Sequence, residues 1–239
     1  MTRAVFAHGF TQTGRSWDGI VTALQATLGD LDPLSPDLPG HGDACDEHLD
    51  LWASAQRLLN SGGPATYIGY SMGGRTALHA ALLEPSLVER LVLIGATAGI
   101  DDSDERAQRR ASDEALATRL EEVDVSDFID RWLQNPLFAG LTDDTAQRSD
   151  RLRNTAHGLA SSLRLTGTGT QAPLWGRLGE IECPTLILVG EHDNKFRALG
   201  ERLNAGITDC SIAVIADSGH SVHLEQPTAT VAAIAEFLR

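Results

Sequence analysis

A serine flanked by glycines is the residue of this chain whose surroundings most clearly suggest chemistry. It lies in the segment Gly69-Tyr70-Ser71-Met72-Gly73, which fits the pattern Gly-x-Ser-x-Gly. A short β-type run at residues 65–68 precedes the segment, and helix-forming residues at 75–82 follow it. Between a strand and a helix, this motif holds the serine hydroxyl clear of the backbone at a helix N-terminus that favours negative charge. The sequence therefore predicts that Ser71 is a nucleophile or a proton relay.

Candidates for the acid and the base that such a serine needs lie further along the chain. A serine hydroxyl is a poor nucleophile unless an imidazole accepts its proton and a carboxylate orients that imidazole. Asp193 and His220 each follow an apolar run, so both are expected on loops at carboxyl strand ends, in the order Ser, Asp, His. Taken singly, Asp193 could cap a helix and His220 could lie on the surface. Glu191 is an alternative acid and His223 an alternative base, although both fit the loop positions less well.

Backbone N–H groups near Ser71 could form an oxyanion hole. One candidate is the amide of Met72, and the other is the amide of Phe10 in the loop at residues 8–10. Such donors act where negative charge develops, and loss of one typically costs about 2.7–4 kcal/mol. The alternative for residues 8–10 is a plain turn. In the next loop, at residues 37–42, His41 is expected to be structural.

Composition and charge limit the classes of partner. The chain has 239 residues, of which 42% are hydrophobic and 22% are charged, as is usual for a globular protein. A net charge of −14 argues against nucleic acid and anionic membrane surfaces, but a pocket with a few cations could still bind a small anionic substrate. No apolar run approaches the roughly 20 residues of a membrane span. We expect a monomer or a small homo-oligomer.

The spacing of cysteines and histidines predicts neither disulfides nor a metal site. The three cysteines are far apart, and the first residues do not read as a leader peptide, so we expect a reduced, cytoplasmic protein. The histidines show no ligand spacing with carboxylates or thiols, and no Gly-x-Gly-x-x-Gly or Walker loop occurs. We therefore expect no metal and no cofactor.

Short apolar runs alternate with helical patterns over most of the chain. The runs predict strands at residues 3–7, 31–35, 66–69, 90–94, 185–189 and 211–215. The helical patterns predict helices at residues 17–28, 46–60, 73–84, 196–204 and 227–238. Runs that are apolar throughout are typical of parallel strands covered on both faces. The alternation predicts an α/β fold with an open, doubly wound, mostly parallel sheet.

Residues 100–180 interrupt this alternation. They contain no convincing strand, and their patterns predict helices at residues 104–123, 126–134, 143–155 and 158–165. An insertion at this point would lie over the carboxyl edge of the sheet, where ligands bind in open α/β sheets. We interpret residues 1–99 and 181–239 as one core and residues 100–180 as a helical lid.

Taken together, these segments resemble the α/β-hydrolase superfamily. The resemblance rests on residues 8–10, on Asp-Leu-Pro-Gly-His-Gly at 37–42, on the serine motif, on residues 190–193 and on Gly-His at 219–220. It covers essentially the whole core and implies the α/β-hydrolase fold. The first strand matches the third strand of the superfamily's sheet, so the resemblance implies about six strands.

A narrower resemblance is to a family of lyases on this fold, the 2-succinyl-6-hydroxy-2,4-cyclohexadiene-1-carboxylate synthases of menaquinone biosynthesis. It rests on residues 69–75, 104–110 and 190–199, and on Trp132 with residues 136–139. The resemblance implies elimination of pyruvate from an enolpyruvyl cyclohexene carboxylate, with the triad acting as a general base. The main alternative is a serine hydrolase of small esters or of carbon–carbon bonds. A non-catalytic ligand-binding protein is disfavoured, because such a protein should have lost a triad member.

The narrower resemblance also implies a set of substrate-binding residues: Tyr70, Arg75, Arg106, Arg109, Trp132 and Arg153. Arginine forks bind carboxylates in a bidentate manner, which suits a substrate with several carboxylates. Arg75 is expected one helical turn beyond Ser71, on the same face. The alternatives are ordinary helix ion pairs for the lid arginines, which have acidic neighbours, and a place in the core for Trp132. Lys195 is expected to be structural.

Overall fold

Six parallel strands form one open sheet at the centre of the structure, a computed structural model that describes residues 2–239. The strands are β1 Thr2–Ala7, β2 Leu31–Leu34, β3 Ala65–Tyr70, β4 Val88–Ile94, β5 Thr185–Gly190 and β6 Cys210–Ile215. Their order is β2-β1-β3-β4-β5-β6, and every neighbouring pair is parallel. The predicted fold class and number of strands are confirmed.

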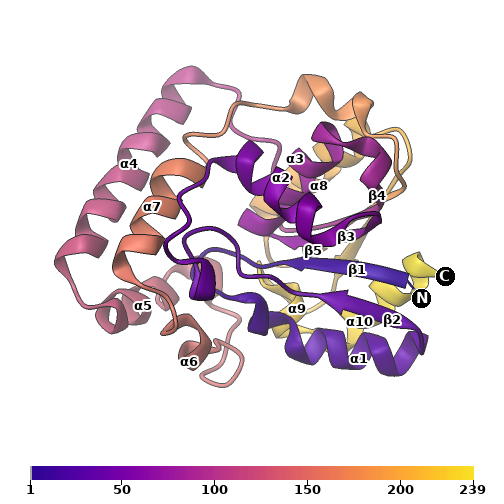
Figure 1. The fold of residues 1–239 in the computed structure, drawn as a ribbon, viewed down its shortest axis with the longest axis horizontal. Helices are drawn as coiled ribbons and strands as arrows, with labels where there is room; N and C mark the ends of the chain where they lie inside the picture. The colour runs from indigo at the N-terminus through magenta and orange to yellow at the C-terminus, as the bar shows by residue number, and fades with distance from the viewer. Residues whose placement is uncertain (1) are drawn as a thin grey trace.

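Helices cover both faces of this sheet (Figure 1). One face packs against α1 Asp18–Leu28 and α10 Pro227–Leu238, through a cluster that includes Leu24 and Ile234. The other face packs against α2 Leu51–Gly62, α3 Met72–Leu83 and α8 Asn194–Gly206, through a cluster that includes Leu58, Leu78 and Leu203. Every residue of β3 and β5 is buried, which explains why these strands are apolar without alternation.

The strand order creates a crevice beside the serine motif. From β1 the chain moves to β2 on one side, and it then returns to place β3 on the other side of β1. In open α/β sheets such a reversal leaves a crevice at the carboxyl ends of the two central strands. The loops after β1 and β3 carry residues 8–10 and Ser71, so the topology places both loops at this crevice.

Between β4 and β5, the described chain forms only helices and loops: α4 Ser103–Glu122, α5 Val125–Leu133, α6 Arg148–Arg151 and α7 Ala156–Thr166, with short 3-10 helices at Pro136–Phe138 and Trp175–Glu180. Helices α4, α5, α6 and α7 lie beyond the carboxyl ends of the strands (Figure 1), whereas Leu178 of the 3-10 helix Trp175–Glu180 belongs to the core cluster beside α8. Among residues 2–239, no helix has both the length and the apolar character needed to cross a bilayer.

Two helix predictions need correction. The helix predicted at residues 143–155 is wrong, because only the single turn α6 forms there. The hydroxyls of Thr142 and Thr145 bind each other's backbone N–H groups, and Gln147 is left-handed with φ 52°, so a continuous helix is interrupted. Helix α2 begins five residues later than residue 46, since Asp50 is extended and its carboxylate accepts the Ala53 N–H at 2.9 Å.

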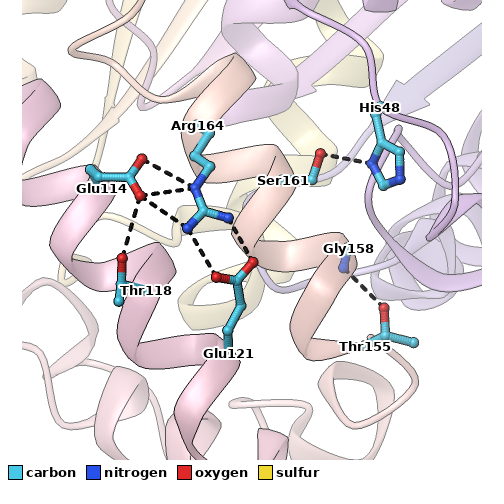
Figure 2. A network of polar contacts seen from close by, with 8 residues as sticks. All are labelled: His48, Glu114, Thr118, Glu121, Thr155, Gly158, Ser161 and Arg164. Carbon is cyan, nitrogen blue, oxygen red and sulfur yellow. Dashed lines mark hydrogen bonds and ion pairs between the residues drawn. The ribbon is translucent and has the colours of Figure 1, made fainter.

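The helices between β4 and β5 have an apolar cluster of their own. It includes Leu120 of α4, Ile129 of α5 and Leu159 of α7, each fully buried. On the outer surface, Arg164 of α7 binds the carboxylates of Glu114 and Glu121 on α4 (Figure 2). Exposed ion pairs contribute little to stability, so the apolar cluster is what holds α4 and α7 together.

The apolar cluster can be tested at Leu159. Leu159→Ala is expected to lower the free energy of unfolding by about 2–5 kcal/mol, because it leaves a cavity at a fully buried position. Leu152→Ala is the matched control, since Leu152 is 37% exposed, and it should change that free energy by less than about 0.5 kcal/mol. Equilibrium urea unfolding measures both. Equal effects of the two substitutions would contradict the assignment of this core.

Candidate active site

Ser71 occupies a sharp turn between β3 and α3. Its φ of 52° and ψ of −106° lie in a region that side chains rarely adopt. The turn is fixed by the Ser71 N–H, which donates to the Ile94 carbonyl at 2.8 Å. Glycine is required on both sides of the serine. A Cβ on Gly69 would lie 2.4 Å from the Gly73 carbonyl oxygen, and a Cβ on Gly73 would lie 2.1 Å from the Ala7 carbonyl oxygen. The serine is therefore held at the carboxyl edge of the sheet by backbone contacts.

Of the three sequence-predicted triad residues, His220 lies within hydrogen-bonding distance of both of the others. The distance from His220 Nδ1 to Asp193 Oδ2 is 2.8 Å, and the distance from His220 Nε2 to Ser71 Oγ is 3.3 Å. The Asp193 carboxylate also caps α8, since its Oδ1 accepts the Phe196 N–H at 3.1 Å. With Nδ1–H donating to the carboxylate, Nε2 is free to accept the serine proton. Asp193 thus makes both of the contacts that the sequence left open: it lies against the His220 ring and it caps α8.

The His220 ring is buried and enclosed on several sides. The Phe196 ring lies 4.3 Å away and the Tyr70 ring 5.3 Å away, between centroids. Gly95, with φ of 54°, lies against the edge of the ring, where a Cβ would be 2.8 Å from His220 Cε1. The imidazole therefore has little room to rotate away from Ser71 and Asp193.

The alternative acid and base are directed elsewhere. Glu191 is exposed, and its Oε2 accepts the Asp217 N–H at 3.0 Å. His223 is buried between the rings of Trp17 and Tyr70, with centroids at 4.7 and 4.4 Å, and neither of its ring nitrogens has a partner among the described residues. Burial lowers the pKa of His223 to about 3, so this ring is neutral near pH 7.

Two buried histidines bind the backbone of the loops after β1 and β2. His8 Nδ1 lies 2.9 Å from the Gly9 carbonyl, and its Nε2 accepts the Leu38 N–H at 2.9 Å. His41 Nδ1 lies 3.0 Å from the Pro39 carbonyl. Burial lowers the pKa of both rings, to about 3 for His41, so each is neutral and takes a single tautomer. His41 is therefore structural here, in line with its expected role.

Phe10 and Met72, the candidates for the oxyanion hole, lie beside the same cavity as Ser71. All three residues line one cavity of about 210 Å³. Within residues 2–239, neither amide forms a hydrogen bond, and Met72 is the first residue of α3. Unpaired backbone N–H groups, such as one at a helix N-terminus, can donate hydrogen bonds to an oxyanion.

Cationic and apolar side chains complete the wall of this cavity. Of the described residues, the cationic ones are Arg75, Arg109, Arg151 and Lys195. The apolar part of the wall comes mainly from Phe10, Trp132, Leu137, Phe138, Leu163 and Phe196. Tyr70 also lines the cavity, and its hydroxyl is 2.7 Å from Ser221 Oγ. The Trp132 indole N–H is buried and has no partner among the described residues.

Arg75 is 7% exposed and is held by neutral oxygens. Its Nη1 donates to the Thr166 carbonyl at 2.5 Å and to Gln171 Oε1 at 3.3 Å. Burial, and to a lesser degree Arg109, lowers the pKa of Arg75 to about 10, so the guanidinium remains charged at neutral pH. A buried cation with neutral partners is stabilised by an anion.

Arg151 is a second buried cation, and no motif or spacing in the sequence singled it out. It is 1% exposed, its Nε donates to the Ala146 carbonyl at 2.8 Å, and its Nη1 donates to Thr11 Oγ1. Asn154 binds the Thr11 carbonyl at 2.6 Å. Thr11 has φ of 69°, so α6 and the residues after it hold the loop that presents Phe10 in an unusual conformation.

Two arginines that the resemblance implied lie outside the cavity. Arg106 donates to the Ile100 carbonyl at 2.7 Å, at the start of α4, and it does not line the cavity. Arg153 is 3.3 Å from Asp43 and lines a separate surface hollow. Arg109 does line the cavity while it pairs with Asp113 at 2.8 Å, so the ion-pair alternative and the cavity position both apply to it.

One exposed trio of side chains could approach a metal ion. Glu191, His192 and Asp217 have ligand atoms within 4.8 Å of one another. The trio does not line the cavity, and one oxygen of Glu191 already accepts a backbone N–H. Exposed acidic groups of this kind are common without a bound metal, so the trio adds nothing to the chemistry beside Ser71.

Comparison with known proteins identifies the family. A family model described as "Alpha/beta hydrolase family" matches residues 4–234. The chain belongs to the α/β-hydrolase family. A relative from Bacillus subtilis (strain 168) is 35% identical over 98% of this chain and 89% of its own length. A relative from Escherichia coli O1:K1 / APEC, named 2-succinyl-6-hydroxy-2,4-cyclohexadiene-1-carboxylate synthase, is 34% identical over 98% of this chain and 93% of its own length.

Solved structures of this family agree with the fold. The structure of MenH from S. aureus superposes with a TM-score of 0.92 at 31% identity, over 100% of this chain and 94% of that one. A thermophilic esterase from Thermogutta terrifontis has a TM-score of 0.83 at 23% identity, over 100% of this chain and 90% of that one. The second similarity concerns the fold alone. The relatives are enzymes, and this α/β-hydrolase chain is therefore an enzyme of the same family.

The contact between Gly95 and the histidine can be tested by adding one methyl group. Gly95→Ala is expected to reduce turnover strongly, because its Cβ would lie 2.8 Å from His220 Cε1 and displace the ring. Gly29→Ala is the matched control, since Gly29 also has positive φ, at 81°, but a Cβ there meets nothing within 4 Å. Both should lose roughly 1–2 kcal/mol of stability from backbone strain. Turnover measured beside thermal unfolding separates the effects, and equal activity of the two variants would refute the contact.

The buried His223 predicts a specific loss of stability in acid. Its folded pKa of about 3 lies below the ordinary value of 6.5, so the unfolded chain binds the extra proton and stability falls as pH drops through 6.5. One such group costs roughly 2 kcal/mol at pH 5. Urea unfolding at pH 7.5 and pH 5 should show a smaller pH effect in His223→Phe than in the wild type. His192→Phe, at an exposed position, is the control, and the same pH effect in all three proteins would contradict the prediction.

Proposed function

We propose that this protein is a lyase that eliminates pyruvate from 2-succinyl-5-enolpyruvyl-6-hydroxy-3-cyclohexene-1-carboxylate, the reaction of the menaquinone pathway for which its relatives are named. The observation that carries the proposal is a serine–histidine–aspartate line facing two buried arginines whose direct partners are neutral oxygens. In such a cavity the serine and histidine can remove a proton from a polyanionic substrate while the arginines bind its carboxylates.

The reaction follows from the structures that the two compound names describe. The substrate has a C3=C4 double bond and an enolpyruvyl group on C5, whereas the product has C2=C3 and C4=C5. A base must therefore remove the proton from C2, C2=C3 forms, the original double bond moves to C4=C5, and the C5–O bond breaks. The leaving enolpyruvate takes a proton and becomes pyruvate, so no water is consumed.

The triad supplies the base in this proposal. C2 lies next to the succinyl ketone, so loss of its proton gives an enolate. Ser71 Oγ accepts the proton as its own proton passes to Nε2 of His220, and Asp193 stabilises the imidazolium that results. The serine acts as a proton relay, and no acyl-enzyme forms. The free amides of Phe10 and Met72 would stabilise the enolate oxygen.

The cations match the charge of this substrate. Its ring, succinyl and enolpyruvyl groups each carry one carboxylate at neutral pH. Arg75, Arg109, Arg151 and Lys195 bring positive charge to the cavity of a chain whose net charge is −14. In this proposal residues 100–180 act as a lid, because they supply Arg109, Arg151 and Trp132 to the cavity wall and exclude water from the enolate.

The proposal is tested by the cost of losing Arg75 in two reactions. In Arg75→Met, kcat/KM for pyruvate release from the enolpyruvyl substrate should fall by about 30-fold to several thousand-fold. This is the usual cost of removing one partner of a buried, hydrogen-bonded charge pair. Hydrolysis of p-nitrophenyl acetate should change little, because that ester carries no carboxylate. A coupled pyruvate assay and release of nitrophenolate measure the two reactions.

Two further variants complete this experiment. Arg106→Met is the matched control, because Arg106 lies on the first lid helix but outside the cavity, and it should release pyruvate at the wild-type rate. Ser71→Ala should lose both reactions. If the wild type hydrolyses the ester but releases no pyruvate, the protein is a serine hydrolase and the lyase proposal is wrong. Near-normal pyruvate release by Ser71→Ala would refute the role of the serine.

A further inference from the structure

We propose that Glu225 is a positioning residue for His220. In this proposal the lid segment that ends at Gly140 affects the position of the His220 ring, because it contacts the Glu225 carboxylate. This inference rests on the proposed role of His220 as the base. Glu225 does not line the cavity, so it would act through the backbone of the histidine loop and not by touching a substrate.

The Glu225 carboxylate binds the peptide groups on both sides of His220. Its Oε2 accepts the Gly219 N–H at 2.7 Å, and its Oε1 accepts the Ser221 N–H at 2.9 Å. Each oxygen of one charged group thus takes one amide, and hydrogen bonds to a charged acceptor are the stronger kind. Because the two amides flank His220, the carboxylate fixes the backbone from which the imidazole projects.

Neighbouring contacts hold the rest of this loop against the acid loop. The His192 N–H donates to the Ser218 carbonyl at 2.8 Å, and a Cβ on Gly190 would lie 1.9 Å from the Gly219 carbonyl oxygen. The acid loop therefore bounds the histidine loop on one side, and Glu225 binds its amides. Without the carboxylate, the Gly219 and Ser221 amides would lose their acceptor, and the loop could rotate the ring away from Ser71.

The lid contacts the same carboxylate. A Cβ on Gly140 would lie 1.9 Å from Glu225 Oε2, so the Gly140 backbone is packed directly on this oxygen. The residues just before it, Leu137 and Phe138, line the cavity. A ligand that presses on these two side chains acts on a segment in contact with Glu225, and through Glu225 on the backbone of His220.

The first test replaces the carboxylate by its neutral isostere. A glutamine offers one acceptor oxygen, and its amino group faces the other N–H, so Glu225→Gln should lower kcat for pyruvate release by about 10- to 100-fold. KM should stay within about twofold, because the substrate contacts are intact. Glu236→Gln is the matched control, since it makes the same change at an exposed position on α10 and should leave kcat unchanged.

A second readout does not depend on the substrate. Phosphonylation of Ser71 by a fluorophosphonate requires His220 to accept the serine proton, so its rate reports the position of the ring. Glu225→Gln should be labelled more slowly than the wild type in proportion to its loss of kcat. Thermal unfolding checks that the variant is folded under the assay conditions.

The coupling to the lid is tested by adding a methyl group at Gly140. Gly140→Ala should lower kcat, because its Cβ would displace the Glu225 carboxylate, whereas Gly176→Ala meets no atom within 4 Å and serves as the control. In the Glu225→Ala background, Gly140→Ala should have a much smaller effect, because the side chain that its Cβ displaces is absent. Additive effects of the two substitutions would overturn the coupling.

The outcomes separate this inference from the proposed function. A kcat and a labelling rate of Glu225→Gln within twofold of the wild type would overturn the positioning role. If the wild type is labelled at Ser71 but releases no pyruvate, the lyase proposal fails, and the labelling rates still decide the role of Glu225. If Ser71 of the wild type is not labelled at all, the triad fails and this inference fails with it.

Discussion

The site depends on one buried imidazole that is within hydrogen-bonding distance of a partner at each ring nitrogen. His220 can meet Asp193 and Ser71 together only because β3, β5 and β6 run parallel and end at the same edge of the sheet. Glycines then bring the three loops close enough, since Gly69, Gly73 and Gly95 stand where a Cβ would collide. The fold thus converts wide separation in sequence into contacts of about 3 Å between side chains.

The second constraint is electrostatic. Burying a guanidinium among neutral oxygens is costly unless a negative charge can join it. Arg75 reaches the cavity from the core helix α3, and Arg151 reaches it from α6 between β4 and β5, so the positive potential exists only while both parts are packed together. The same packing ties α6 to Thr11 and so to the loop that presents the Phe10 amide. The proposed anion site and the proposed oxyanion hole are therefore linked by the same contacts.

Much of the core could be predicted because its elements are governed by local patterns. Strands such as β3 and β5 are apolar at nearly every position, because both faces are covered, and the serine motif sits where such a strand must turn into a helix. The structure of residues 143–155 is harder to predict from the sequence. Polar side chains there bind nearby backbone groups and the loop after β1, and such contacts leave no periodic pattern in the sequence. Arg106 and Arg109 share a helix face, but a shared face does not reveal which side chain reaches a cavity.

The sequence by itself determined the type of fold, the order Ser71, Asp193, His220 and the glycines that allow the serine turn, because strand patterns, motif order and backbone freedom are properties of short segments. Only the tertiary structure decided that Arg151 lies in the cavity while Arg153 points to the surface, and that Glu225 binds the amides around His220. Those outcomes depend on how helices and loops distant in sequence pack on the sheet. That packing decides which charged side chains are buried beside the cavity and which remain at the surface.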